Sequence, residues 1–459
     1  MIFTQYYLDC LSQASYLIGD ESSGRAVVVD PRRDVGEYVD DANAAGLTIE
    51  MVIETHFHAD FLSGHLELAN RTGAKIAYSS VAEPEYEFQP LGDGERMSLG
   101  EITLEFRHTP GHTPESLSIV VWEKESDATP YGVLTGDTLF IGDVGRPDLL
   151  TSVGYSRDEL AGQLYDSLHG QLLTLPDDTR VYPGHGAGSA CGKNLSTDTW
   201  STIGDQRVTN YAVAAPDRST FIELVTEGQT TAPAYFAYDA ALNKQDRSLH
   251  DETVPPRELT LVEVDELTAS GAILVDSRDA EVFSQGHLRG SINVGLEGRY
   301  AEYAGSVIEP NADMVLVTEP GAEIESKTRL ARIGFDRIVG SLADPYGTME
   351  AHPDRTNTAS RLTSTQLAVC IDNIADLQLV DVRQPGEVSL GTIEGAVKIP
   401  VGQLQQRFEE LDTSRPTIVF CAGGYRSAVA ASVLRLRDFN DVSDLIGGYS
   451  AWIRLGNTR

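Results

Sequence analysis

The sequence predicts a multidomain α/β protein, and three observations support this fold class. The chain has 459 residues, more than one hydrophobic core usually supports, so we expect two to four domains of roughly 100 to 200 residues each. Residues up to about 240 alternate short apolar runs with helical patterns, as strands and helices do in α/β folds. Farther along, two similar stretches of about 100 residues each indicate an internal repeat and hence two domains of one fold.

The chain is strongly acidic, with 69 Asp and Glu residues against 35 Lys and Arg and a formal charge of -34. Such a charge repels nucleic acid and anionic membrane surfaces, so we expect neither as a partner and attribute the acidity to solubility. Residues 1–7 lack the basic and apolar regions of a signal peptide, and no apolar run reaches the roughly 20 residues that span a bilayer. We therefore expect a cytoplasmic protein.

The four cysteines, Cys10, Cys191, Cys370 and Cys421, are widely separated and form no CxxC pair. A disulfide framework or a structural zinc site is therefore not expected. Any cysteine with a function should act singly, as a thiol.

Periodicity and turn residues place the first elements of the chain. The expected elements are a helix at 35–45 and strands at 15–19, 25–30, 49–54, 102–106, 117–121 and 132–135. The strand at 49–54 leads into Thr55 to His65, where His56, His58, His65 and Asp60 share one strand-to-helix turn. An unpaired buried polar group costs roughly 1 to 3 kcal/mol, so a metal ion is the expected partner of these side chains.

Three later clusters repeat this arrangement of a His or Asp in a Gly/Pro turn after an apolar strand. They are 109–116 with His112, 135–138 with Asp137 and followed by 142–148, and 182–186 with His185. A single loop histidine usually caps or hydrogen-bonds, but these residues in this order indicate side chains that converge on one metal site.

The order HxHxD, GH, GD and GHG resembles the metallo-β-lactamase fold, which implies an αββα sandwich with the metal at one sheet edge. In that family the first motif usually has the sequence HxHxDH, and this chain has Phe61 at the position of the last His. A second metal would then keep only Asp60, Asp137 and His185 as candidate ligands, so a binuclear zinc hydrolase is disfavoured. Two imidazoles and one carboxylate suit mononuclear non-haem Fe(II) and O2.

The longer strings HFHADFLSGH, GDVGRPDL and GHGAGSACG are similar to the persulfide dioxygenase branch of this fold. By position, the resemblance implies that His56, His112 and Asp137 bind one Fe(II) per chain, with zinc as the alternative. It places His58, Asp60 and His185 behind these ligands, where they orient them and hold waters. Asp30 at a strand end resembles a residue that supports the fold.

Two residues near the third and fourth clusters have two open interpretations each. Arg146 could bind a carboxylate of a thiol cofactor such as glutathione, or form a salt bridge with Asp143 or Asp148. Cys191 could accept or relay sulfane sulfur, or be a buried, inert cysteine.

The second half begins with a polar, irregular stretch at 241–258 that we interpret as a linker. The repeat follows, since 273–281 matches 378–387 and 290–294 matches 395–400. Both copies alternate strand and helix, so each should be a small parallel α/β domain. The expected domains are 1–240, 259–357 and 360–459.

In the second copy, a buried strand runs into Cys421, a Gly-rich loop, Arg426 and a helix from Ser427. The N–H groups of such a loop, the helix N-terminus and Arg426 direct positive charge at the sulfur, which stabilises a thiolate or persulfide and makes Cys421 a nucleophile candidate. The alternative is a core cysteine at a strand end. The stretch resembles a rhodanese active-site loop, which implies catalytic roles for Cys421 and Arg426.

The first copy has Thr318 in place of the cysteine and Glu323 in place of the arginine, and Pro320 removes an N–H donor. We predict that this copy is a catalytically silent rhodanese-like domain that serves as a spacer or docking surface.

The whole architecture resembles the fusion proteins of bacterial sulfide detoxification that join a persulfide dioxygenase to rhodanese domains. This implies an enzyme with persulfide dioxygenase (sulfur dioxygenase) and thiosulfate sulfurtransferase activities. Its expected partners are a small thiol persulfide, O2, sulfite and thiosulfate, and we expect a homo-oligomer. Two rivals are a glyoxalase II-like zinc thioester hydrolase with a sulfurtransferase domain and a non-catalytic sulfur-relay or sensing protein.

Overall fold

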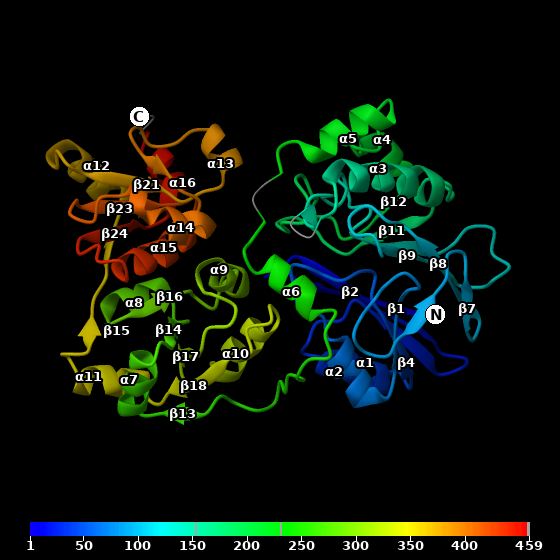
Figure 1. Cartoon of the computed structure of the whole chain (residues 1–459), viewed down its shortest axis with the longest axis horizontal. Helices are drawn as coiled ribbons and strands as arrows, with labels where there is room; N and C mark the ends of the chain where they lie inside the picture. Colours follow the sequence, from blue (N-terminus) through cyan, green and yellow to red (C-terminus); the bar gives the residue numbers. More distant parts are fainter. Residues whose placement is uncertain (152–153, 230–231, 457–459) are drawn as a thin grey trace. The chain divides into compact units, whose positions relative to one another are not determined.

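The computed structural model describes residues 1–151, 154–229 and 232–456. The chain divides into two compact units (Figure 1). The N-terminal unit comprises Met1–Ala232 and Phe236–Asp251, and the C-terminal unit comprises Pro233–Tyr235 and Glu252–Arg459.

Two six-stranded sheets form the centre of the N-terminal unit. The first sheet has the order β1-β2-β3-β4-β5-β6, with strands β1 (Ile2–Leu8), β2 (Gln13–Asp20), β3 (Arg25–Val29), β4 (Thr48–Ile53), β5 (Lys75–Ser79) and β6 (Gln89–Leu91). The second has the order β12-β11-β10-β9-β8-β7, with strands β7 (Arg96–Leu99), β8 (Ile102–His108), β9 (Leu117–Trp122), β10 (Gly132–Gly136), β11 (Arg180–Pro183) and β12 (Ser201–Thr202).

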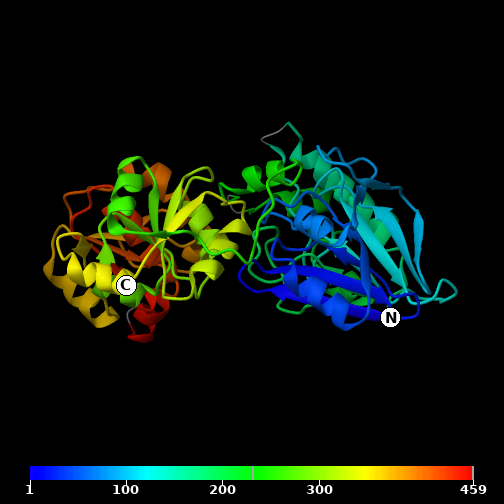
Figure 2. The ribbon, with the colours of Figure 1, turned by 90° about the horizontal axis from the view of Figure 1, so that it is seen from below.

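Helices cover the outer face of each sheet, which gives the four layers of the predicted αββα sandwich. Figure 1 shows α1 and α2 on one side of the two sheets and α3, α4 and α5 on the other, and Figure 2 views the same unit from below, with the strands of the second sheet in light blue and cyan. The helices are α1 (Gly36–Ala44), α2 (His65–Thr72), α3 (Arg157–Ser167), α4 (Ile203–Thr209), α5 (Arg218–Thr226) and α6 (Phe236–Leu242).

The strands are apolar on both faces because each sheet is packed on both sides. In β9, Ile119 and Val121 point into the core between the sheets, whereas Val120 packs against the helices beyond the second sheet. In β3, Val27 faces the same central core and Val28 faces the layer of α1 and α2. This period of two explains why the sequence shows short continuous apolar runs here.

The predicted elements of this unit are confirmed, with boundaries that differ by a few residues. The expected strands correspond to β2, β3, β4, β8, β9 and β10, and the expected helix at 35–45 corresponds to α1. The two expected strands at 15–19 and 25–30 form the antiparallel ladder of β2 and β3.

The stretch interpreted as a linker, 241–258, differs from that expectation in its first half. Residues up to Asp251 belong to the N-terminal unit, where Asn243 is fully buried and Arg247 forms an ion pair with Glu67. The polar side chains that suggested a solvated linker instead form hydrogen bonds and ion pairs with buried polar groups of the N-terminal unit.

The C-terminal unit contains two five-stranded parallel sheets of the same topology, which confirms the internal repeat. Their orders are β13-β18-β17-β14-β16 and β20-β24-β23-β21-β22, so each strand of the first copy has a counterpart in the second. The strands of the first copy are β13 (Glu258–Leu259), β14 (Ile273–Asp276), β16 (Ser291–Asn293), β17 (Met314–Val317) and β18 (Ile338–Leu342). Those of the second are β20 (Ser360–Leu362), β21 (Gln378–Asp381), β22 (Val397–Lys398), β23 (Thr417–Phe420) and β24 (Val442–Leu445). A short antiparallel pair, β15 (His287–Leu288) and β19 (Thr356–Asn357), lies outside these sheets.

Helices follow the strands in both copies, as parallel strand connections require. The first copy has α7 (Leu261–Ala269), α8 (Ala280–Gln285), α9 (Tyr300–Val307), α10 (Glu323–Ala331) and α11 (Pro345–Ala351). The second has α12 (Ser364–Asn373), α13 (Pro385–Ser389), α14 (Leu404–Arg407), α15 (Tyr425–Arg435) and α16 (Gly448–Arg454).

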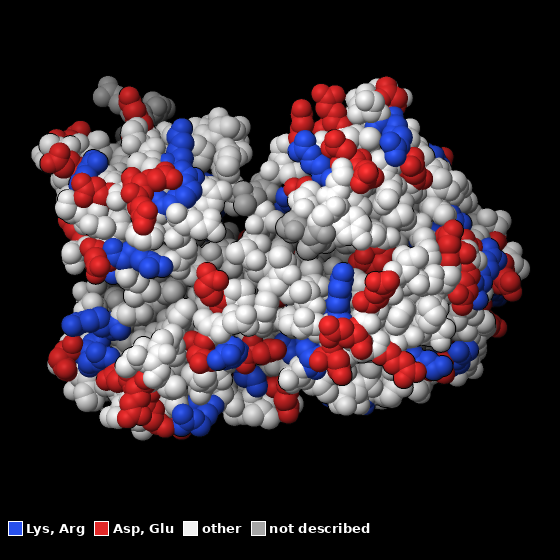
Figure 3. Space-filling view, viewed as in Figure 1, with Lys and Arg blue, Asp and Glu red and all other residues white. Residues whose placement is uncertain are grey.

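On the face shown in Figure 3, the acidic side chains are spread over the visible surface and interleaved with basic ones. Within the part of the chain that the structure describes, every helix is too short or too polar to cross a membrane.

Candidate functional site

Loops at the ends of strands carry the residues predicted to bind metal. These are His56, His58 and Asp60 after β4, His112 between β8 and β9, Asp137 after β10, and His185 after β11. The strands β10 and β11 are parallel neighbours, so their carboxyl ends meet at one edge of the second sheet. The N–H of Leu117 donates to the carbonyl of Thr55 over 2.8 Å, which joins the loop after β4 to that sheet.

The side chains of His56, His112 and Asp137 converge on one point. Nε2 of His112 lies 3.5 Å from Oδ2 of Asp137, and Nε2 of His56 lies 4.0 Å from the same oxygen. The two imidazole rings are perpendicular, with centroids 4.9 Å apart. All three side chains are buried, and one ligand atom from each lies within 4.8 Å of the others.

Hydrogen bonds fix the tautomers of both imidazoles. Nδ1 of His112 lies 2.9 Å from the carbonyl oxygen of Arg146, which can only accept, so Nδ1 carries the proton. The Thr55 hydroxyl donates to Oδ2 of Asp30 over 2.8 Å and therefore accepts from Nδ1 of His56 over 3.0 Å. Each Nε2 is thus left with a lone pair that faces Oδ2 of Asp137. Burial and the neighbouring His58 lower the pKa of His56 well below its ordinary value, so its imidazole stays neutral.

His185 lies behind Asp137 and links it to Asp60. Its Nδ1 is 2.7 Å from Oδ1 of Asp137, and its Nε2 forms a 2.7 Å ion pair with Oδ2 of Asp60. Burial opposes the charge of His185, but Asp137 and Asp60 raise its pKa well above the ordinary value. Burial likewise opposes ionisation of Asp137, yet His185 and the other imidazoles hold its pKa well below the usual range. Asp137 is therefore an anion with Oδ2 free to act as a ligand.

The donor set fits a metal ion. Nε2 of His56 and Oδ2 of Asp137 are buried without a hydrogen-bond partner. Leaving such atoms unpaired costs about 1 to 3 kcal/mol each, and a shared cation satisfies them together. Two neutral imidazole nitrogens and one carboxylate oxygen are donors that suit iron with open positions, and zinc also takes them.

His58 forms a separate buried cluster with Asp30 and Glu54. Its Nε2 lies 3.1 Å from Oδ1 of Asp30 and 3.4 Å from Oε2 of Glu54. Burial opposes protonation, but Asp30 and Glu54 raise the pKa of His58 to about 10, so it is an imidazolium between two acids. Burial raises the pKa of Glu54 to about 7. Phe61 packs on the His58 ring, with centroids 4.3 Å apart.

Asn243, which the sequence did not predict as part of the site, supports this loop. Its Nδ2 donates to the carbonyl oxygens of His58 and Phe61 over 2.8 and 2.9 Å, and its Oδ1 accepts from the N–H of Ser63 over 2.9 Å. No short-range signal points to this role, because Asn243 lies 180 to 185 residues from these partners in the chain.

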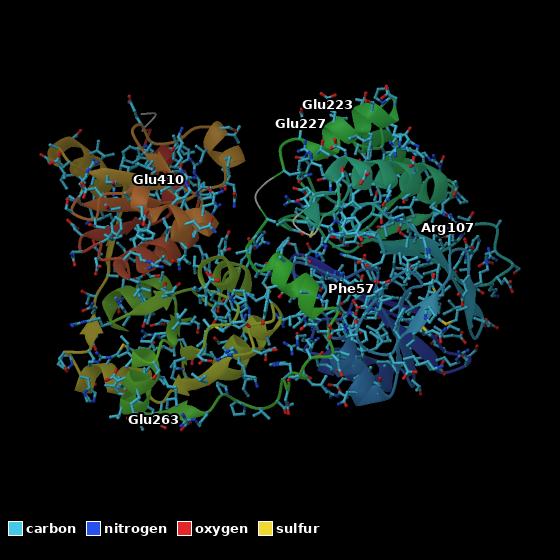
Figure 4. All side chains as sticks on the ribbon, in the orientation of Figure 1. Phe57, Arg107, Glu223, Glu227, Glu263 and Glu410 are labelled. Carbon is cyan, nitrogen blue, oxygen red and sulfur yellow. The ribbon has the colours of Figure 1, made fainter. Side chains whose placement is uncertain are left out.

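Other residues after α6 also contact the loop. The Lys244 ammonium lies 4.9 Å from the ring of Phe57, which Figure 4 labels beside α6, and the Arg247 guanidinium donates to the carbonyl of Ser63. The segment that follows α6 is therefore part of the support of the candidate metal centre.

The structure places Arg146 and Cys191 next to the site, but the Arg146 guanidinium is already paired with a carboxylate and the Cys191 side chain is buried. The Arg146 guanidinium is 2% exposed and forms two hydrogen bonds, of 2.7 and 2.8 Å, with the carboxylate of Asp148. Its geometry is thus that of the salt-bridge interpretation, and its carbonyl holds His112. Cys191 is 1% exposed beside Asp60 and His185. Burial, together with the charges of Asp60 and Asp137, raises the pKa of its thiol well above the ordinary value.

The second predicted site, Cys421, lies at the end of β23 and before α15. Its side chain is 1% exposed, and the N–H of Gly424 donates to Sγ over 3.1 Å. The Ser427 hydroxyl, in the first turn of α15, lies 3.6 Å from Sγ. Gly424 has φ +105°, a conformation that residues with a side chain rarely adopt, so the turn that aims this N–H at the sulfur depends on glycine.

Arg426 differs from the sequence expectation, because its charge is already paired. Both of its Nη atoms donate to the carboxylate of Glu387 over 2.6 Å. The sequence could not show this pair, since Glu387 lies 39 residues earlier, in α13. Burial opposes ionisation of Glu387, but Arg426 lowers its pKa below the ordinary value.

The matching position of the first copy carries no thiol. Thr318, which follows β17, is 2% exposed, and the carboxylate of Glu323 accepts from the N–H of Gly321 over 3.2 Å. This arrangement offers neither a sulfur nucleophile nor a cation, as the sequence predicts for a silent copy.

Comparison with known families matches both halves of the chain. Residues 8–185 match the metallo-beta-lactamase superfamily, and residues 260–344 and 367–455 each match the rhodanese-like domain. The two rhodanese matches coincide with the two copies of the repeat.

Known proteins support the same division. Persulfide dioxygenase ETHE1 of Homo sapiens is 30% identical over 200 residues, which cover 43% of this chain and 69% of that protein. A cytoplasmic hydroxyacylglutathione hydrolase of Arabidopsis thaliana is 33% identical over 183 residues, 39% of this chain and 66% of that protein. A solved metallo-beta-lactamase structure from Staphylococcus aureus has a TM-score of 0.67 and 32% identity and covers 75% of this chain and 99% of its own. The chain spans 54% and 63% of the length of the first two curated relatives it matches.

Proposed function

Because this chain belongs to the metallo-β-lactamase superfamily, with an N-terminal domain homologous to the persulfide dioxygenases and two rhodanese-like domains after it, we propose that it oxidises a small thiol persulfide with O2 and transfers sulfane sulfur at Cys421. The observation that carries the proposal is the convergence of His56, His112 and Asp137 in a chain that also holds a rhodanese cysteine loop.

In the dioxygenase reaction, a thiol persulfide RSSH, O2 and water yield the thiol RSH, sulfite and two protons. One Fe(II) per chain, bound by His56, His112 and Asp137, would supply the O2 chemistry. The residues behind them keep the donors in their binding state: Thr55 and the Arg146 carbonyl hold the protons on Nδ1 of the two imidazoles, and His185 orients Asp137.

In the transferase reaction, the Cys421 persulfide donates its outer sulfur to sulfite, which forms thiosulfate and returns the Cys421 thiol. The N–H of Gly424 stabilises the sulfur anion that each transfer leaves on the cysteine. Both reactions handle sulfane sulfur, so sulfite made in the first is a substrate of the second. We propose glutathione persulfide or a similar carrier as the substrate, and sulfide detoxification as the role.

Metal analysis on anaerobically prepared protein, followed by O2 consumption with glutathione persulfide, tests the proposal. We expect one iron per chain and O2 uptake that requires the persulfide. His56→Ala should abolish O2 uptake and leave sulfur transfer from thiosulfate intact, whereas Cys421→Ser should do the reverse. If His56→Ala left all measurable activity unchanged, the metal domain would not be catalytic and the sulfur-relay alternative would hold.

One observation favours a second candidate function, a zinc thioester hydrolase. Asp60, His185 and Cys191 form another buried group whose ligand atoms lie within 4.8 Å of one another, beside the first. The hydroxyacylglutathione hydrolase match adds a relative of that class. Two zinc ions per chain with thioester turnover, and no persulfide-dependent O2 uptake, would establish this alternative. The expected cytoplasmic location, homo-oligomer and lack of nucleic-acid or membrane partners stay predictions.

A further inference from the structure

The silent rhodanese-like copy contacts the Cys421 loop directly, within the C-terminal unit. The Tyr425 hydroxyl, which belongs to the second copy, donates to the carbonyl oxygen of Gly295 in the first copy over 2.5 Å. The Tyr425 ring lies against Gly298, where an added Cβ would be 2.2 Å from the ring. The first copy therefore holds both the hydroxyl and the ring of Tyr425.

The segment that receives Tyr425 is itself fixed in place. Arg329, from α10 of the first copy, donates to the carbonyl oxygens of Leu296 and Gly298 over 2.5 and 2.7 Å. Its guanidinium also lies 5.9 Å from the ring of Tyr300 in α9. The Arg329 side chain thus holds two backbone carbonyls of the segment, and this fixes the surface on which the ring of Tyr425 packs.

Tyr425 lies between two residues of the cysteine loop. It follows Gly424, whose N–H donates to Sγ of Cys421, and it precedes Arg426, which pairs with Glu387. It is also the first residue of α15, so a shift of its ring moves the turn that presents the sulfur. Tyr303 of α9 packs on the Tyr425 ring with centroids 5.5 Å apart and adds a second contact from the silent copy.

We propose that Tyr425 is a positioning residue for sulfur transfer, anchored by Gly295 and Gly298, and that the silent copy is in this way a structural part of the Cys421 site. The proposal deepens the transferase half of the proposed function and rests on it. It replaces the expectation of a mere spacer or docking surface with a specific contact. The contact acts through the Gly424 N–H, because that donor and Tyr425 are adjacent in the chain.

Tyr425→Phe in the full chain tests the hydroxyl anchor. We expect the single-turnover rate of sulfur loading on Cys421 from thiosulfate to fall about tenfold, since small displacements of reacting groups have effects of this size. The final fraction of chains that gain the mass of one sulfur atom should stay unchanged, as should the thiosulfate dependence. A purely structural defect would instead reduce that fraction. Tyr346→Phe is the matched control, because its hydroxyl bonds Glu319 at an exposed site in the same unit and its loss should leave the loading rate unchanged.

Gly298→Ala tests the same anchor from the silent copy. The added methyl group must displace the Tyr425 ring, so we expect a similar loss of rate. Gly286→Ala is its control, because the nearest atom to the added Cβ is 3.7 Å away. If Tyr425→Phe and Gly298→Ala both load sulfur at the unaltered rate, or if the controls lose as much, the proposal is wrong.

Hydrogen exchange of the peptide over residues 421–427 separates this proposal from the proposed function. The two test variants should exchange faster than the unaltered chain there, whether or not sulfur is transferred. A chain that loads no sulfur, but whose test variants exchange faster, would refute the transferase activity and keep the anchor. Unchanged exchange in both test variants would refute the anchor itself.

Discussion

Replacing Asn243 by alanine should loosen the loop that carries the candidate metal ligands. The side chain is fully buried, and it serves two carbonyl oxygens and one N–H of that loop. Alanine leaves these three backbone groups without their side-chain partner. Each unpaired buried group costs about 1 to 3 kcal/mol, so the loop should lose about 3 to 5 kcal/mol of stability after partial relaxation.

The free energy of local opening is the quantity to measure. Hydrogen exchange of the peptide over 56–65 at increasing urea reports it without the assumption that the two units unfold together. The same variant should bind metal more weakly by a factor of about 10 to 100, as is typical when a group that orients ligands is lost. Metal content after dialysis against a weak chelator gives this second readout.

Asn373→Ala is a suitable control, because that amide makes one exposed hydrogen bond to the carbonyl of Val369 in α12. It should change stability by less than about 0.5 kcal/mol. A loss below about 1 kcal/mol in Asn243→Ala, with unchanged metal retention, would refute the view that the segment after α6 supports the site.

Three further predictions concern single residues. Burial opposes ionisation of Glu67, but its two arginine partners lower its pKa from 4.5 to about 2. The Glu67 charge should therefore stabilise the N-terminal unit by about 3 kcal/mol above pH 4.5, and this stabilisation should disappear as the pH falls toward 2. Urea unfolding of Glu67→Gln should therefore differ most from the unaltered chain at neutral pH, and a constant difference down to pH 3 would contradict this assignment. In Gly184→Ala, the new Cβ would lie 2.7 Å from Oδ1 of Asp137, so metal content should fall at least about tenfold, whereas Gly170→Ala meets no atom within 4 Å and should retain it. Cys421→Ala should abolish sulfur loading while persulfide-dependent O2 uptake stays within about twofold, since the two sites lie in separate compact units; a parallel loss of both would show direct dependence.

The parts of the fold that sequence predicted best are those with a local signal. The strands that contain Val28 and Val120 show short apolar runs because both of their faces are buried, and turn residues mark their ends. The convergence of the His and Asp clusters followed from the same logic, since residues just past strand ends meet at a sheet edge, whereas the choice of His56, His112 and Asp137 as ligands came from the family resemblance.

The parts that sequence did not predict depend on contacts between distant segments. Asn243 lies in a polar stretch that has the composition of a linker, and its burial depends on how that stretch folds back on the loop after β4. Glu387 is an ordinary acid in α13 until the fold brings it to Arg426. Composition and periodicity report what a segment can do alone, whereas pairing over 39 or 185 residues is set by the tertiary structure.

In the silent copy, the residues that the fold requires are kept, whereas the cysteine that the chemistry requires is not. Both copies keep the ion pair after their second strand, Asp276 with Arg278 and Asp381 with Arg383, in which the guanidinium caps the carboxylate through two nitrogens. That pair is buried in each, and loss of one partner would leave an uncompensated charge, so the fold retains it whatever the chemistry. The cysteine carries no such constraint, and threonine fills its position in the first copy without disturbing the strand. The first copy still constrains sulfur transfer through Gly298. Any larger residue at this position would collide with the ring of Tyr425, which positions the Cys421 loop of the second copy.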